Sequence, residues 1–197
     1  MLTNMVTGFI ILVVGGVILF VAALLEFEAL KRGKISVVDP AWSLEIPAAG
    51  ILAFLILGET LTGYQVLLII FLIFGLFLIS FRGQAFSKSF FLEKGVTISI
   101  IAAIIMGCAN FFVGWGARET TPLAVNFAVC LIAALGSGIF LGIRGKLLGS
   151  FKHLVISPKV MLPMIFLDNI AWIAFAYGMV LAPIGITVAL SESYIII

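Results

Sequence analysis

The chain has 197 residues, of which 63% are hydrophobic and 10% are charged, and its mean hydropathy is +1.34. A water-soluble fold of this composition would expose a very large apolar surface, so the composition excludes a soluble globular protein and indicates that lipid surrounds the chain. The net charge of +2 comes from short loops rather than from a basic patch, and it gives no support for nucleic-acid binding.

Seven apolar stretches follow one another along the chain, and none alternates with the period of a strand. Six are long enough to cross about 30 Å of hydrocarbon as helices. They cover residues 6–30, 35–57, 64–81, 96–117, 122–143 and 160–181, and a seventh, 183–197, stops in mid-pattern. Because backbone amides in lipid need internal partners, we predict an all-α, polytopic transmembrane helix bundle with about seven helices present.

The basic residues alternate along the chain. Ten of the eleven Lys and Arg residues lie in every second gap between apolar stretches, and Arg118 is the exception. The ten are Lys31, Arg32, Lys34, Arg82, Lys88, Lys94, Arg144, Lys146, Lys152 and Lys159. Because short cytoplasmic loops retain basic residues, these gaps should be cytoplasmic and residue 1 should lie outside. We expect a multi-pass protein of the prokaryotic cytoplasmic membrane.

Local signals add detail to this map. The segment from Gly58 to Gly63 is a tight external turn, in which Thr62 and Gln65 have the spacing of a capping box for the next helix. Gly138 and Gly142 have the spacing of small residues that let two membrane helices approach closely.

Three acids lie deep in apolar stretches. Glu45 and Glu192 are each about nine residues into a helix, and Asp168 is about eight residues into its own, which places all three near the midplane. A charged carboxylate there costs roughly 2.5 to 3.5 kcal/mol, and no intramembrane Lys or Arg is available as a partner. We therefore take the three as candidates for substrate binding or coupling in a wet cavity. The alternative is an acid satisfied by neighbouring polar groups, without substrate contact.

The surroundings of Glu45 favour this interpretation. Pro47 lacks an N–H and frees the carbonyl of Ser43, so the helix is expected to break beside the acid. Trp42, one turn before Glu45, is a further candidate for the wall of the cavity or is a packing residue.

Other polar side chains are open to two interpretations. Asn169 and Trp172 accompany Asp168 either as a polar and aromatic cavity wall or as an ordinary helix contact. Asn110 and Asn126 are secondary candidates that better suit helix-to-helix hydrogen bonds.

Two further acids, Glu26 and Glu28, lie near the cytoplasmic end of the first helix. We interpret them as a surface site at the headgroup boundary, with Glu28 four residues before Arg32 as an ion pair. Arg118 and Glu119, at an external helix end, are interpreted as anchors.

A weak internal repeat connects the two parts of the chain. A shift of 147 residues places Glu45 over Glu192 and Ala29 over Ala176. The loop before Glu45 is basic and its counterpart is uncharged, so the equivalent helices run in opposite directions. This pattern is typical of the inverted repeats of secondary transporters.

Several motifs resemble those of one family. They are AlaLeuLysArgGlyLysIleSerValVal (29–38), GluIlePro (45–47), LeuGlyGluThrLeuThr (57–62), GlyCysAlaAsnPhePheValGlyTrpGly (107–116) and AlaProIleGlyIleThrValAlaLeuSer (182–191). The chain resembles EamA-type members of the drug/metabolite transporter superfamily, and the turn with Gly58 and Glu59 is the most specific signature. Glu59 is expected to order this turn.

The resemblance implies a ten-helix inverted-repeat transporter, of which this chain resembles a fragment. Residues 1–81 would be the last three helices of the first repeat, 82–95 a cytoplasmic linker, and 96–197 the first four helices of a truncated second repeat. Two preceding helices would place the start of a full chain outside, whereas the family usually has cytoplasmic termini. Either insertion is opposite, or the number of missing helices differs by one.

The repeat and the midplane acids predict a secondary transporter that moves a small organic metabolite or drug across the membrane by alternating access. Proton coupling is left open, because a carboxyl group moved between wet and dry surroundings can release a proton. The alternative is a non-transporting subunit or half-transporter, and the sequence leaves open a homodimer or a partner membrane chain.

An enzyme is not expected. The sequence has no His-Glu-x-x-His or Gly-x-Ser-x-Gly motif, and His153 is its single histidine. Cys108 and Cys130 suit packing positions rather than metal binding. We therefore predict no catalytic residues, no metal site and no cofactor, with a small solute and the lipid bilayer as partners.

Overall fold

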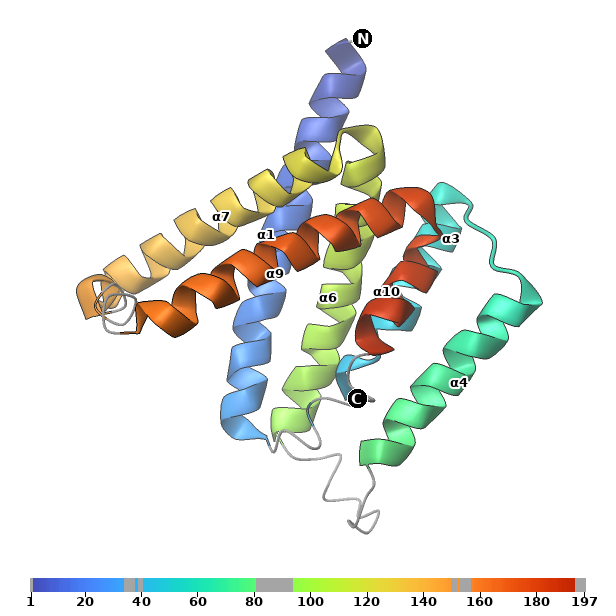
Figure 1. Cartoon of the computed structure of the whole chain (residues 1–197), viewed down its shortest axis with the longest axis horizontal. Helices are drawn as coiled ribbons and strands as arrows, with labels where there is room; N and C mark the ends of the chain where they lie inside the picture. The colour runs from blue at the N-terminus through green and yellow to red at the C-terminus, as the bar shows by residue number, and fades with distance from the viewer. Residues whose placement is uncertain are drawn as a thin grey trace.

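The computed structural model describes residues 2–33, 38, 41–80, 94–149, 152 and 157–193. Its helices are α1 (Leu2–Arg32), α3 (Glu45–Leu57), α4 (Gly63–Ser80), α6 (Lys94–Glu119), α7 (Pro122–Ile143), α9 (Pro158–Leu181) and α10 (Ile184–Glu192) (Figure 1). These residues form no strand. The predicted all-α membrane bundle is confirmed. The proposed linker at 82–95 and His153 lie outside the described residues, apart from the start of α6.

Four helices are long and apolar enough to cross a membrane: Val6–Arg32, Gly95–Glu119, Pro122–Ile143 and Pro158–Leu181. The single helix expected over 35–57 differs in the structure, because α3 begins at Glu45 after a turn at Ser43 and Leu44. α3 has 13 residues, about 20 Å of helix.

The helix α6 lies at the centre of the bundle and packs against α1, α3, α7, α9 and α10. Half of its membrane span is buried, compared with 6% of the span in α7 and 11% in α9. α7 and α9 lie side by side and present most of their apolar side chains outward (Figure 1). α4 stands at the edge and contacts α10. The core therefore forms around α6, and the other helices offer lipid-compatible faces.

The two ends of α6 join different parts of the chain. At its start, Gly95 lies against Gly33 at the end of α1, and the buried Ser99 hydroxyl donates a hydrogen bond of 2.9 Å to the carbonyl of Val38. Near its other end lie the turns at 58–62 and 182–183 (Figure 1). The first and third gaps thus lie at one end and the second at the other, as the charge pattern requires. Which end faces the cytoplasm stays a prediction.

The predicted capping box is present at the start of α4. The Thr62 N–H donates to Oε1 of Gln65 at 2.9 Å, and the Gln65 N–H donates to Oγ1 of Thr62 at 3.3 Å. Before it, Gly58 ends α3 with a φ of 67°, a left-handed conformation that favours glycine. The reciprocal bonds satisfy amides that the helix itself leaves without partners.

Close approach between helices occurs at a different glycine from those expected. Within the described part of the chain, a Cβ added to Gly138 or Gly142 would meet nothing within 4 Å, so these glycines do not bring two of its helices together. At Gly107 of α6, an added Cβ would lie 2.6 Å from the carbonyl oxygen of Glu45 and 2.5 Å from Cβ of Ala48. The small-residue contact therefore lies where α6 meets the start of α3.

Candidate functional site

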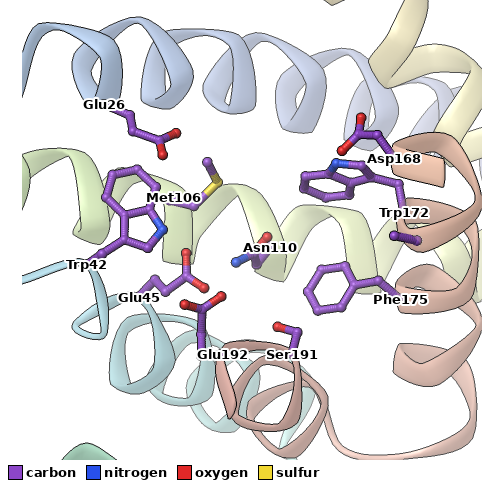
Figure 2. Close-up of a pocket in the computed structure, with 11 residues that line it drawn as sticks. Glu26, Trp42, Glu45, Met106, Asn110, Asp168, Trp172, Phe175, Ser191 and Glu192 are labelled. Atoms are coloured by element: carbon purple, nitrogen blue, oxygen red, sulfur yellow. The ribbon is translucent and has the colours of Figure 1, made fainter. Parts of the chain in front are cut away.

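A cavity of about 360 Å³ lies against α6 and is enclosed by α1, α9, α10, and α3 with the turn before it (Figure 2). It is lined by Glu26, Trp42, Glu45, Met106, Asn110, Asp168, Ala171, Trp172, Phe175, Ser191 and Glu192. Four of these residues are acids and none is Lys, Arg or His. The cavity therefore combines aromatic walls with an excess of carboxyl groups.

Glu45 and Glu192 meet in this cavity because of the direction of their helices. α3 begins at Glu45, α10 ends at Glu192, and the two helices run antiparallel and in contact. The residues are 3% and 7% exposed. Their carboxyl groups face each other (Figure 2), and the side chains are hydrogen-bonded. A hydrogen bond between two carboxyl groups requires a proton on one of them, because carboxylates only accept.

The start of α3 fixes the position of Glu45. The Ile46 N–H donates to the carbonyl of Ser43 at 3.2 Å, and the Ala48 N–H donates to that of Leu44 at 3.3 Å. Pro47, between these two donors, has no N–H and sits in the first turn, where an α-helix tolerates proline. The backbone thus turns beside the acid, where the sequence predicts a break.

Asn110 lies on the α6 wall of the cavity. It is 3% exposed, and its side chain is hydrogen-bonded to Glu45. Its Oδ1 atom is buried and has no hydrogen-bond partner among the described residues. The structure therefore gives this asparagine, which the sequence favoured as a helix-to-helix contact, a place on the cavity wall beside Glu45.

Aromatic side chains form two other walls. Trp172 and Phe175 of α9 pack edge to face, with ring centroids 5.6 Å apart and an interplanar angle of 87°. Trp42 lies at the opposite side of the cavity (Figure 2). Asp168, one turn before Trp172, is exposed and lies at the rim. The cavity thus brings Glu45, Glu192 and Asp168 together with both candidate tryptophans.

Asn169 is a sequence-predicted site residue that does not line the cavity. Its side-chain amide donates to the carbonyl of Ile165 at 2.9 Å, and its Oδ1 accepts from Nδ2 of Asn126 and from Sγ of Cys130, both at 3.4 Å. These bonds join α9 to α7. Asn169 and Asn126 therefore act as helix-to-helix contacts in this structure.

Glu26 is a cavity residue that sequence reasoning assigned to the surface together with Glu28. Two residues apart on a helix, the two side chains point about 200° apart and cannot share a face. Glu28 faces outward, where it pairs with Arg32 at 2.5 Å and Lys31 at 3.6 Å, as expected. Glu26 points into the cavity (Figure 2). The helical phase between the two acids was the available signal.

The turn after α3 makes a polar network with the second part of the chain. Arg118 of α6 forms an ion pair with Glu59 and donates to the carbonyls of Met179 at 2.8 Å and Ala182 at 3.0 Å. The Ile184 N–H, at the start of α10, donates to Oε2 of Glu59 at 2.9 Å. We call these five residues the Glu59 network. It shows that Glu59 joins three elements rather than only its own turn.

The fold and the cavity together define a polytopic helical membrane protein with an acidic and aromatic cavity inside its bundle. Residues 2–81, which include α1, α3 and α4, match the EamA-like transporter family. The resemblance to EamA-type transporters is thus confirmed over these residues, and the match indicates a membrane transporter. No curated protein and no solved structure is a significant match to the chain. Within the described residues, no group of three or more His, Cys, Asp or Glu side chains is arranged to hold a metal ion.

Proposed function

We propose that this chain forms the solute-binding part of a secondary transporter that moves a small organic molecule by alternating access. The observation that supports it is the meeting of Glu45 and Glu192 in one cavity, from helices α3 and α10 that run in opposite directions. Discontinuous or short helices that end at a midplane cavity, from two oppositely oriented parts of a chain, are typical of solute sites in secondary transporters.

The carboxyl pair provides a route to proton coupling. Two carboxyl groups in contact inside a bundle cannot both be ionised without strong repulsion, so the pair holds a proton while it is closed. Opening of the cavity to water, or a solute that separates the two groups, allows both to ionise and releases this proton. Solute movement in one direction is then linked to proton movement in the other.

The experiment uses the purified full chain in liposomes on a solid-supported membrane, with amino acids, nucleosides and organic amines added in turn. We expect at least one class to evoke a current that depends on a pH gradient. In Glu45→Gln this current falls at least about tenfold, because an amide cannot exchange a proton at this position. Glu119→Gln, which removes an exposed acid outside the cavity, keeps the wild-type current.

Full pH-dependent transport in Glu45→Gln removes the residue from coupling. No current with any class, from a chain whose fold is intact by circular dichroism, contradicts transport by this chain alone.

The second candidate is a chain that transports only in an assembly with another copy or another membrane chain. The exposed apolar side chains of α4 favour it, since this helix stands at the edge of the bundle and contacts α10; they include Tyr64, Leu67, Ile70, Phe71 and Phe74. Native mass spectrometry of the protein extracted from its membrane distinguishes the two. A stable complex that alone gives the current supports assembly, and an active monomer contradicts it.

A further inference from the structure

The polar groups of the cavity are mostly hydrogen-bond acceptors. Carboxyl groups reach it from four elements: Glu26 from α1, Glu45 from α3, Asp168 from α9 and Glu192 from α10. Ser191 adds another acceptor, because its hydroxyl proton is already donated to the carbonyl of Val188 at 2.8 Å. Apart from the indole N–H groups and the proton of the carboxyl pair, the cavity has little to donate and much that accepts.

Asn110 gives independent evidence that a donor belongs here. Its amide group is engaged with Glu45, while its buried Oδ1 has no partner among the described residues. A buried acceptor without a partner is costly, and nearly all such atoms in folded proteins are satisfied. Because Asn110 lines the cavity, a bound molecule with an N–H group can provide the missing bond.

The aromatic walls add a second requirement. Trp172 and Phe175 form one wall, Trp42 forms another, and Asp168 lies one turn before Trp172 at the rim. Aromatic faces attract cations, most strongly for tryptophan, and they also accept apolar groups. An anion would meet four carboxyl groups and no basic side chain among the lining residues.

We propose that the cavity binds a protonated organic amine with an aromatic or aliphatic substituent. This rests on the proposed function, in which the bound amine is the transported solute. The ammonium group lies among the carboxyl groups and donates to Oδ1 of Asn110, and the substituent packs on Trp172 and Phe175. Asp168, exposed at the rim, is the first carboxylate that an entering amine meets.

The test measures binding to the purified full chain in nanodiscs by calorimetry, with four probes that share one ring: benzylammonium, benzyltrimethylammonium, benzyl alcohol and benzoate. We expect benzylammonium to bind at least about tenfold more tightly than benzyl alcohol, because a charge contact and a cation–π contact together are of that order. Benzoate binds more weakly still. Equal binding of the alcohol, or tighter binding of benzoate, overturns the proposal without any variant.

Two variants test the roles of single residues. Asp168→Asn weakens benzylammonium binding about tenfold, and the exposed, matched acid variant Glu119→Gln leaves it unchanged. Asn110→Ala weakens benzylammonium but not benzyltrimethylammonium, which has no N–H to donate. Unchanged binding in Asp168→Asn overturns the role of the rim carboxylate, and equal losses for both cations in Asn110→Ala overturn the role of the asparagine oxygen.

Binding and transport fail separately. If benzylammonium binds but evokes no current in liposomes, the amine site stands and the transport function is contradicted. If a neutral or anionic solute gives a Glu45-dependent current and benzylammonium does not bind, transport stands and the amine proposal is overturned.

Discussion

Glu59 and Arg118 are far apart in the sequence, and each has a local interpretation as a turn residue or a helix-end anchor. In the folded chain they form an ion pair with side chains that are 13% and 28% exposed. The guanidinium also binds two carbonyls at the end of α9, where the helix leaves backbone oxygens without internal partners. One arginine therefore satisfies groups from three elements, which is possible because its donors lie in a fixed planar fork.

Arg118→Ala is expected to lower the free energy of unfolding by about 1–3 kcal/mol, because Glu59 and two carbonyls lose their partner in a partly buried place. The measurement is thermal unfolding of the purified protein in detergent. Glu119→Ala, the exposed neighbour, serves as the control and should change stability by less than about 0.5 kcal/mol. Equal stability of the two variants would show that the Glu59 network does not hold these elements together.

At the residue scale, depth along a helix could be predicted and sideways neighbours could not. The count of residues from each loop placed Glu45, Asp168 and Glu192 at similar depth, and all three line one cavity. The same count said nothing of whether Asn110 or Asn169 faces it, because that depends on the rotation of α6 and α9 about their axes. Only packing sets this rotation.

At the element scale, the contact between α6 and α3 positions the carboxyl pair. α6 approaches so closely at Gly107 that no side chain fits between it and the backbone of Glu45. α10 approaches α3 at another glycine pair, where a Cβ on Gly185 would lie 3.2 Å from Cα of Gly50. Van der Waals packing through small residues is the main attraction between helices in lipid. These contacts therefore hold Glu45 next to Glu192.

Gly107→Ala is expected to destabilise the protein by about 1–3 kcal/mol and to weaken solute binding, because the new methyl group pushes the start of α3 away from α6. Gly138→Ala is the matched control: its Cβ meets nothing within 4 Å in the described structure, so unfolding should shift little. Thermal unfolding and benzylammonium calorimetry report the two effects. If both variants keep wild-type stability and binding, the close approach at Gly107 is not what positions Glu45.

At the scale of the whole molecule, the basic gaps and the fold lead to the same two-ended arrangement. The turn at 58–62 lies at the end opposite to the last residues of α1, which carry Lys31 and Arg32 (Figure 1). This arrangement follows from the number of membrane crossings, which the apolar stretches already determine. The absolute sidedness rests on the retention of basic loops in the cytoplasm.

A cysteine-accessibility experiment tests the sidedness. In a chain with Cys108 and Cys130 replaced by Ser, a membrane-impermeant maleimide added to intact cells should label Thr60→Cys and leave Lys146→Cys unlabelled until the membrane is broken. The positive charges retained on the cytoplasmic side are the physical reason. The reverse labelling pattern would invert the orientation map and bring the chain into line with the usual family orientation.

The sequence alone determined the features that depend on solvation and local geometry. Lipid as solvent requires helices wherever apolar stretches are long, and Thr62, Gln65 and Gly58 set the turn between α3 and α4 through bonds within a few residues. The tertiary structure alone decided which polar groups share a cavity and which join helices. Glu26 points inward, Asn169 points to α7, and Glu59 reaches Arg118, because the rotation and crossing of helices are set by packing over the whole bundle rather than by any short segment.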